Sequence, residues 1–241
     1  MRFEWTDEKI EQYIRASKYT EFHKNLAARI HPFLNESDRI LDIGCGTGCI
    51  DIALSPWVKS ITAFDIDDRA IDYFKEEIKK SDMHNITAYT RDFSQMSTID
   101  CDVALLCYFG ATHDELLEII HAARRQTIVV MHSAGATTKP SKISRKVKHT
   151  SATQMHQFLS AMDLDYDFVD TRLEFGQPLR SKEEAIHFFE GYLQHFTHEE
   201  RAQKIQVQLE ELEKIDDKQY PYFYSRMKDI SIFIIRGSAS E

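Results

Sequence analysis

The chain has 241 residues, of which 42% are hydrophobic, and it carries a formal net charge of −9 at neutral pH. This length allows one large domain or one domain with an elaboration. The negative charge argues against non-specific binding of nucleic acid, whose affinity comes largely from neutralised phosphates. No apolar run reaches membrane-spanning length, and the first residues, MRFEWTDEKI, lack the apolar core of a signal peptide. We therefore expect a cytoplasmic protein without a membrane partner.

The four cysteines show no paired spacing that would build a zinc site, so no metal is expected and the thiols should be reduced. The first predicted element is an amphipathic helical region over residues 6–34, which ends near Pro32. We expect residues 1–35 to form a helical cover for the remainder of the chain.

Residues 36–132 alternate between strand-like and helix-like stretches. Apolar, β-branched runs predict strands at 39–43, 60–66, 85–89, 102–108 and 127–132. A short helix ends at Ser55-Pro56, and helical spacing of apolar residues predicts helices at 69–80 and 113–125. Strands that are apolar on both faces and alternate with amphipathic helices indicate a parallel sheet covered on two sides.

After residue 132 the pattern changes. We predict a helix at about 151–162, a strand at 166–175, two helices that begin at the capping patterns Ser181/Glu184 and Thr197/Glu200, and a last strand at 229–237. The fold class is therefore α/β: a doubly wound, mostly parallel seven-stranded sheet with an antiparallel last strand and helices on both faces. The main domain would span 36–241, with a helical insertion at 176–228.

A glycine-rich turn, LDIGCGTG at 41–48, lies between the first strand and the first helix of this pattern. Such a turn points free backbone N–H groups at a ligand, at the sheet edge where ligands of open parallel sheets bind. The dinucleotide fingerprint G-x-G-x-x-G fits Gly44 and Gly46 but requires glycine where Cys49 stands. The spacing therefore excludes a pyrophosphate ligand.

The next two strand ends carry acidic residues. Asp65 follows the second strand, where a carboxylate can accept both hydroxyls of a ribose. Asp92 and Phe93 follow the third strand, where the edge and face of an adenine would lie. Each residue also has a structural interpretation, because Asp65 can cap the following helix and Asp92 can be a surface turn residue. Together the three strand ends predict a nucleoside without phosphates.

These motifs, ILDIGCGTG, ITAFDID and RDFSQM followed by CDVALLCYFG, resemble those of class I S-adenosylmethionine-dependent methyltransferases over about residues 36–132. The resemblance implies S-adenosyl-L-methionine as cofactor and S-adenosyl-L-homocysteine as product. It implies that Asp42 holds the cofactor's amino group, that the glycines approach its methionine part, and that Asp92 binds the adenine amino group beside Phe93. The full implied set is Asp42, Gly44, Cys45, Gly46, Gly48, Asp65, Ile66, Asp92, Phe93 and Cys107, the last through its backbone.

The methyl acceptor should bind above the ends of the fourth and fifth strands. A general base is needed there only if the acceptor carries a proton with a high pKa. Candidates are Tyr108, His113 and His132, of which His132 is the best placed base and Tyr108 the second catalytic candidate; Tyr108 can also be a wall of the pocket, and His113 a simple helix-start residue. The acceptor atom, oxygen, sulfur, nitrogen or carbon, stays open.

The predicted partner is a small-molecule acceptor. A basic segment at 139–149, with Lys139, Lys142, Arg145, Lys146 and Lys148, would recruit an anionic acceptor, or RNA as an alternative, or would be a solvated loop. No aromatic residue lies between these charges, which disfavours a nucleic acid. A non-catalytic S-adenosylmethionine-binding module is the alternative from another class, and both a monomer and a homodimer fit the sequence.

Overall fold

The computed structural model describes residues 4–95, 100–133 and 151–237. The chain forms two compact units, of which the first comprises residues 1–10, 23–173 and 229–241 and the second comprises residues 11–22 and 174–228. None of the helices in the described ranges combines the length and apolar character needed to cross a bilayer.

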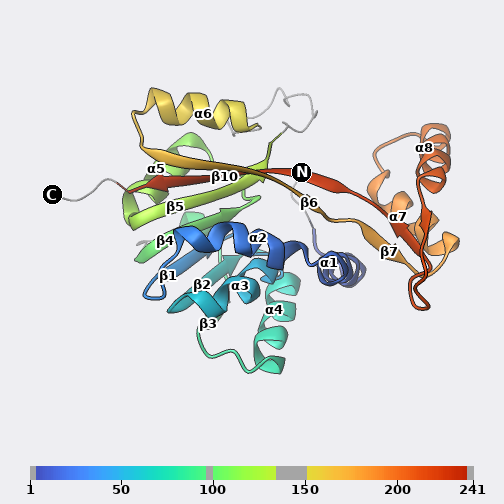
Figure 1. Cartoon of the computed structure of the whole chain (residues 1–241), viewed down its shortest axis with the longest axis horizontal. Helices are drawn as coiled ribbons and strands as arrows, with labels where there is room; N and C mark the ends of the chain where they lie inside the picture. Colours follow the sequence, from blue (N-terminus) through green and yellow to red (C-terminus); the bar gives the residue numbers. More distant parts are fainter. Residues whose placement is uncertain (1–3, 96–99, 134–150, 238–241) are drawn as a thin grey trace. The chain divides into compact units, whose positions relative to one another are not determined.

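The first unit is built on a seven-stranded sheet with the strand order β3-β2-β1-β4-β5-β10-β6 (Figure 1). Its strands β1 to β5 are mutually parallel, and β10 pairs antiparallel with β5, with Phe233 opposite Val129. This arrangement confirms the predicted fold class. The strands are β1 (Arg39–Ile43), β2 (Ser60–Asp65), β3 (Ile86–Thr90), β4 (Cys101–Cys107), β5 (Ala123–His132), β6 (Tyr166–Glu174) and β10 (Met227–Arg236).

Helices cover both faces of this sheet. One core cluster joins α5 (His113–Ala122) and α6 (Ala152–Ala161) to inward-facing residues of the strands, Leu41, Ile43 and Phe233 among them. The opposite side carries α2 (Phe22–Ile30), α3 (Cys49–Leu54) and α4 (Asp68–Lys80), as Figure 1 shows. Because both faces of the sheet are covered, the four consecutive residues 40–43 of β1 are buried, which explains why this stretch is apolar except for Asp42. Short 3₁₀ turns lie at His31–Phe33, Ser55–Trp57 and Phe93–Gln95.

Two predicted helices have different bounds. The region 6–34 is divided into α1 (Asp7–Thr20) and α2, because Glu21 between them has a left-handed backbone with φ of +51°. The helix predicted to reach residue 125 ends at Ala122, since Ala123 already pairs with Cys101 of β4. Arg125 is held in the strand by the buried carboxylate of Asp38.

The second unit contains helices and a small sheet. Its helices are α7 (Lys182–Tyr192) and α8 (His198–Glu210), and Thr197 opens α8 with the predicted capping box. The strands β7 (Gln177–Leu179), β8 (Glu213–Lys214) and β9 (Tyr222–Tyr224) form a sheet of order β7-β9-β8. The segment 176–228 thus contains the two predicted helices and, in addition, three short strands. The sequence did not indicate these strands, because two or three residues are too few to show an alternating pattern.

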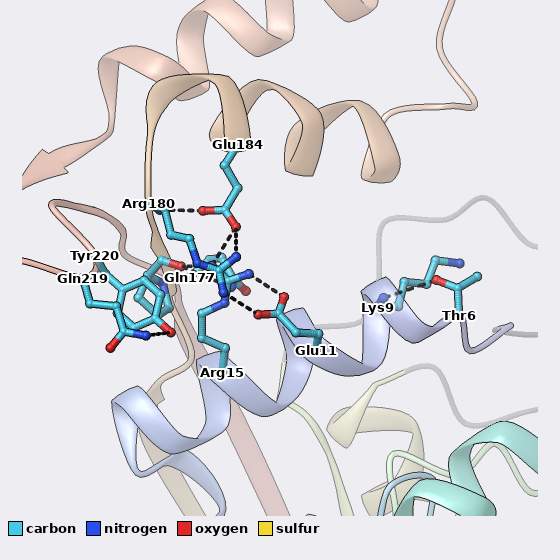
Figure 2. A network of polar contacts seen from close by, with 10 residues as sticks. Thr6, Lys9, Glu11, Arg15, Gln177, Arg180, Glu184, Gln219 and Tyr220 are labelled. Carbon is cyan, nitrogen blue, oxygen red and sulfur yellow. Dashed lines mark hydrogen bonds and ion pairs between the residues drawn. The ribbon is translucent and has the colours of Figure 1, made fainter.

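An ion-pair network joins residues 11–22 to the rest of this second unit (Figure 2). The buried Arg15 guanidinium donates to Glu184 at 2.8 Å, to Glu11 at 2.5 Å and to the carbonyl of Pro178 at 3.2 Å. Arg180 binds the same two carboxylates from the outside, at 3.1 Å and 3.0 Å. The Glu184 carboxylate accepts hydrogen bonds from both arginines. Ser181 still caps α7 by accepting the Glu184 N–H, but the return bond from the glutamate side chain, which the capping-box pattern predicted, is not formed.

Arg15→Met is expected to destabilise this unit by roughly 1–3 kcal/mol, because it removes charged hydrogen bonds from a buried position while keeping much of the side-chain volume. Arg180→Met is the matched control, since its side chain is 53% exposed and surface pairs contribute about 1 kcal/mol or less. Urea unfolding and amide hydrogen exchange in α7 measure the difference. Equal losses for the two variants would show that burial of Arg15 does not set the strength of the network.

Candidate functional site

The glycine turn follows β1 and is held by the end of β2. The N–H groups of Gly44 and Cys45 both donate to the carbonyl of Phe64, at 2.7 Å and 3.0 Å. Gly44 has φ of +81°, and a Cβ there would lie 2.4 Å from the Phe109 ring. Only glycine fits this position, because the positive φ is unfavourable for L side chains and a Cβ would collide with the aromatic ring.

Asp65 connects this turn to the next strand end. One carboxylate oxygen accepts the Gly46 N–H at 2.9 Å, and the other accepts the Asp67 N–H at 2.9 Å. The cap of α4 is Asp67, whose side chain accepts from Arg69 and Ala70. The capping role that the sequence left open for Asp65 thus belongs to its neighbour. Each Asp65 oxygen keeps capacity for a further hydrogen bond, and Ile66 beside it is 41% exposed.

Trp5 lies against the turn and was not found by the sequence reasoning. Its ring would be 3.2 Å from a Cβ at Gly46. The Trp5 backbone is anchored by its N–H to Asp67 at 3.4 Å and by its carbonyl to Arg69 at 3.4 Å. A single aromatic residue outside any motif gives no sequence signal for this position.

The remaining predicted cofactor residues occupy different environments. Asp92 is exposed after β3, while Phe93 is half-buried and packs against the core cluster of α5 and α6. A Cβ on Gly48 would lie 2.2 Å from the Phe74 ring, so this glycine is required for packing of α3 against α4. Cys45 is buried beneath the turn.

The two catalytic candidates meet at the ends of β4 and β5. The rings of Tyr108 and His132 are 4.7 Å apart and inclined by 35°. Tyr108 has φ of +56°, a conformation that is uncommon for a bulky residue and is enriched at functional sites. Burial, and then the nearby Cys107, raise the pKa of the Tyr108 phenol, which is therefore protonated at neutral pH. His113 instead stacks on Phe158 at 4.4 Å.

The thiol of Cys107 is a poor nucleophile in this setting. Burial, followed by the charges of Asp42 and Asp51, raises its pKa well above the usual range. Within the described ranges, no group of three or more His, Cys, Asp or Glu side chains is arranged to hold a metal ion.

Asp42 has a second buried carboxyl for a neighbour, which the sequence reasoning missed. Asp42 lies in β1 before the turn and Asp51 lies in α3 after it, and both side chains are fully buried. No donor in the described part of the chain hydrogen-bonds any of their four carboxyl oxygens. The two carboxyls are electrostatic neighbours, because the charge of Asp42 helps to raise the pKa of Asp51. Two buried carboxylates beside each other repel, which favours a state in which the pair shares one proton.

Burial and the charge of Asp65 raise the pKa of Asp42 to about 7, although the interaction with Asp51 opposes the shift; burial and then Asp42 raise the pKa of Asp51. An acid whose pKa is raised by folding stabilises the fold below its unfolded pKa, and this stability is lost as the pH rises through the folded value.

The free energy of unfolding of the wild type, relative to that of Asp51→Asn, should therefore fall by on the order of 1–3 kcal/mol between about pH 4 and pH 7. Asparagine keeps the size of the side chain and removes the shared proton. Urea titrations at several pH values provide the measurement, and parallel pH profiles for the two proteins would contradict a shared proton.

Several N-terminal aromatic residues have packing roles. Tyr13 contacts Phe175 at 5.2 Å and Tyr19 contacts Phe223 at 5.5 Å, all within the second unit. His23 is buried in the first unit, and burial lowers its pKa to about 3, so it is neutral. The basic segment 139–149 lies outside the described residues.

Residues 40–127 match the family model of the methyltransferase domain. Among curated proteins, the ribosomal protein L11 methyltransferase of Thermotoga petrophila is 25% identical over 115 residues, which are 47% of this chain and 43% of that protein. The chain thus spans less than half the length of the curated relatives that it matches.

Solved structures extend the similarity of fold to most of the chain. The YcgJ protein of Bacillus subtilis has a TM-score of 0.55 at 16% sequence identity. The superposition covers 90% of this chain and 98% of the YcgJ chain. The magnesium protoporphyrin IX methyltransferase of Synechocystis PCC 6803, with bound S-adenosylhomocysteine, has a TM-score of 0.52 at 10% identity and covers 98% of this chain and 90% of its own.

Proposed function

We propose that this chain, which belongs to the class I, Rossmann-like methyltransferases through the domain at residues 40–127, is an enzyme that transfers a methyl group from S-adenosylmethionine to a small-molecule acceptor. The observation that carries the proposal is the joint geometry of the turn and Asp65, in which the Gly46 N–H and the carboxylate are fixed against each other at 2.9 Å.

The residues at this edge fit the cofactor. The turn offers a backbone surface without side chains at Gly44 and Gly46, and Asp65 retains acceptor capacity for two ribose hydroxyls. The exposed Ile66 would provide an apolar contact for the nucleoside beside Asp65. Asp92 and Phe93 would contact the adenine, and the backbone of Cys107 would contact the cofactor near its sulfur.

When bound, the cofactor supplies a methyl group already activated by its sulfonium charge. The protein's task is then to align the acceptor atom, exclude water and hold the developing charge. Asp42 would hold the amino group of the cofactor, and Asp65 would accept the hydroxyls of its ribose. Trp5, anchored over Gly46, shields the turn from solvent.

The acceptor would lie beside Tyr108 and His132. His132 is exposed at the end of β5 and can take a proton from a hydroxyl or thiol acceptor. The protonated Tyr108 can donate a hydrogen bond to the acceptor and position the imidazole by ring contact at 4.7 Å. An acceptor that has no acidic proton would need only the positioning role.

Two other functions share the same cofactor site and differ in the partner. RNA methylation would use the basic segment 139–149 and would give salt-sensitive binding that is lost when Lys142, Arg145 and Lys146 are neutralised. A cofactor sensor would bind both cofactor and product but methylate nothing. The curated relative described above is named for a ribosomal protein substrate, so ribosomal proteins belong among the acceptors to be tested.

Asp65→Ala should weaken S-adenosylmethionine and S-adenosylhomocysteine alike by about 10- to 100-fold, because charged hydrogen bonds to the ribose contribute roughly 1.5–3 kcal/mol. Asp68→Ala is the matched control three residues away. It removes an exposed carboxylate from the first turn of α4 and should leave both affinities nearly unchanged. Isothermal titration calorimetry gives these constants, and full affinity in Asp65→Ala would rule out the ribose assignment.

His132→Gln should lower kcat by about 10²- to 10⁴-fold on an acceptor that must lose a proton, while cofactor affinity stays the same. Methyl transfer from labelled cofactor to a panel of phenols, thiols, amines and carboxylates identifies the acceptor class first. Tyr108→Phe separates the two roles, since it keeps the ring contact with His132 and removes the hydroxyl. Unchanged kcat in His132→Gln on every methylated hydroxyl or thiol would argue against a histidine base.

A further inference from the structure

The buried pair of Asp42 and Asp51 brackets the glycine turn. Asp42 belongs to β1, two residues before Gly44, and Asp51 belongs to the first turn of α3, three residues after Gly48. Both are completely excluded from solvent. Two carboxyls without donors in such a place would be costly as two charges, because burial without compensation disfavours the charged form strongly.

Among the described residues, the titratable groups that interact electrostatically with this pair are one acid and two thiols. They are Asp65 of β2, Cys45 of the turn and Cys107 at the end of β4. None of these three supplies a positive charge. The pair therefore retains at least one proton at neutral pH and below, and burial raises the pKa of Asp42 to about 7.

We infer that Asp42 and Asp51 form a proton-linked sensor of positive charge on the glycine turn, which releases the shared proton when a cationic ligand binds. This inference rests on the proposed function, because S-adenosylmethionine carries an ammonium group and a sulfonium at this edge. Asp51 is a positioning residue in this scheme, since it acts through Asp42.

The proton release involves only the carboxyl pair and solvent. The O–H bond of the protonated carboxyl breaks, the proton passes to solvent, and both carboxylates remain ionised opposite the ligand's positive charge. No bond to carbon or sulfur forms or breaks. A unit charge about 6 Å away contributes roughly 3 kcal/mol at an effective dielectric constant of 20, which is about two pKa units and enough to expel the proton near neutral pH.

The consequence is discrimination between cofactor and product. S-adenosylmethionine bears the sulfonium charge, whereas S-adenosylhomocysteine has a neutral thioether in its place. The cofactor should therefore release more of the shared proton than the product does. Its affinity relative to that of the product should fall as the pH drops below the pKa of the pair, by up to about tenfold per pH unit.

Calorimetric titrations of the full chain at pH 6.5, in two buffers with different ionisation enthalpies, measure the protons released. We expect release approaching one proton with S-adenosylmethionine, less with S-adenosylhomocysteine, and none with 5′-methylthioadenosine, which lacks both cationic groups. Asp51→Asn should abolish the release and the pH dependence of the cofactor-to-product affinity ratio.

The ligand series in the wild-type protein tests the inference even if the variant fails to fold. Binding of the cofactor without proton release, or equal release with all three ligands, overturns it and leaves the proposed function standing. Equal release in a folded Asp51→Asn protein also overturns it. Failure of both cofactor and product to bind at any pH would instead remove the proposed function, and the inference with it.

Discussion

The hydrogen bond between the Gly46 N–H and the Asp65 carboxylate joins the ends of two neighbouring parallel strands, and the geometry of the site depends on it. The register of β1 and β2 sets Ile43 opposite Phe64, so the next two N–H groups of the turn reach the Phe64 carbonyl. Asp65 is the next residue of β2, and its carboxylate lies within hydrogen-bond distance of the Gly46 N–H. The sheet register thus determines where the backbone donors and the acidic acceptor lie relative to each other.

Most of the sheet and the cofactor edge could be predicted, because their signals are local in sequence. Strands buried on both faces read as apolar runs, and a glycine turn after such a run marks the ligand edge. Trp5 and Asp51 could not be found this way, since each acquires its role from a tertiary contact, with Gly46 and Asp42 respectively. The break at Glu21 likewise follows from one left-handed residue that carries no glycine signal.

The contact between Tyr108 and His132, where the acceptor is proposed to bind, follows from the same parallel arrangement. Cys107 of β4 lies opposite Val130 of β5, so Tyr108 and His132 leave adjacent strand ends and their rings meet. A sequence shows that two strands end in chemistry-bearing residues, but the ring contact depends on the left-handed backbone of Tyr108. What binds beyond them is decided by segments that the sheet does not constrain, which is why the acceptor class is the least predictable property of the chain.

The charges around the glycine turn explain why a phosphate-free ligand suits it. In a dinucleotide site, backbone N–H groups face an anion, and nearby carboxylates would repel it. Here the N–H groups of Gly44, Cys45 and Gly46 already bond within the protein, and three carboxyls, Asp42, Asp51 and Asp65, surround the turn. These carboxyls disfavour an anionic ligand. Under the proposed function, they favour a nucleoside that carries an ammonium and a sulfonium, and the loss of the sulfonium charge on methyl transfer would weaken the attraction to the product.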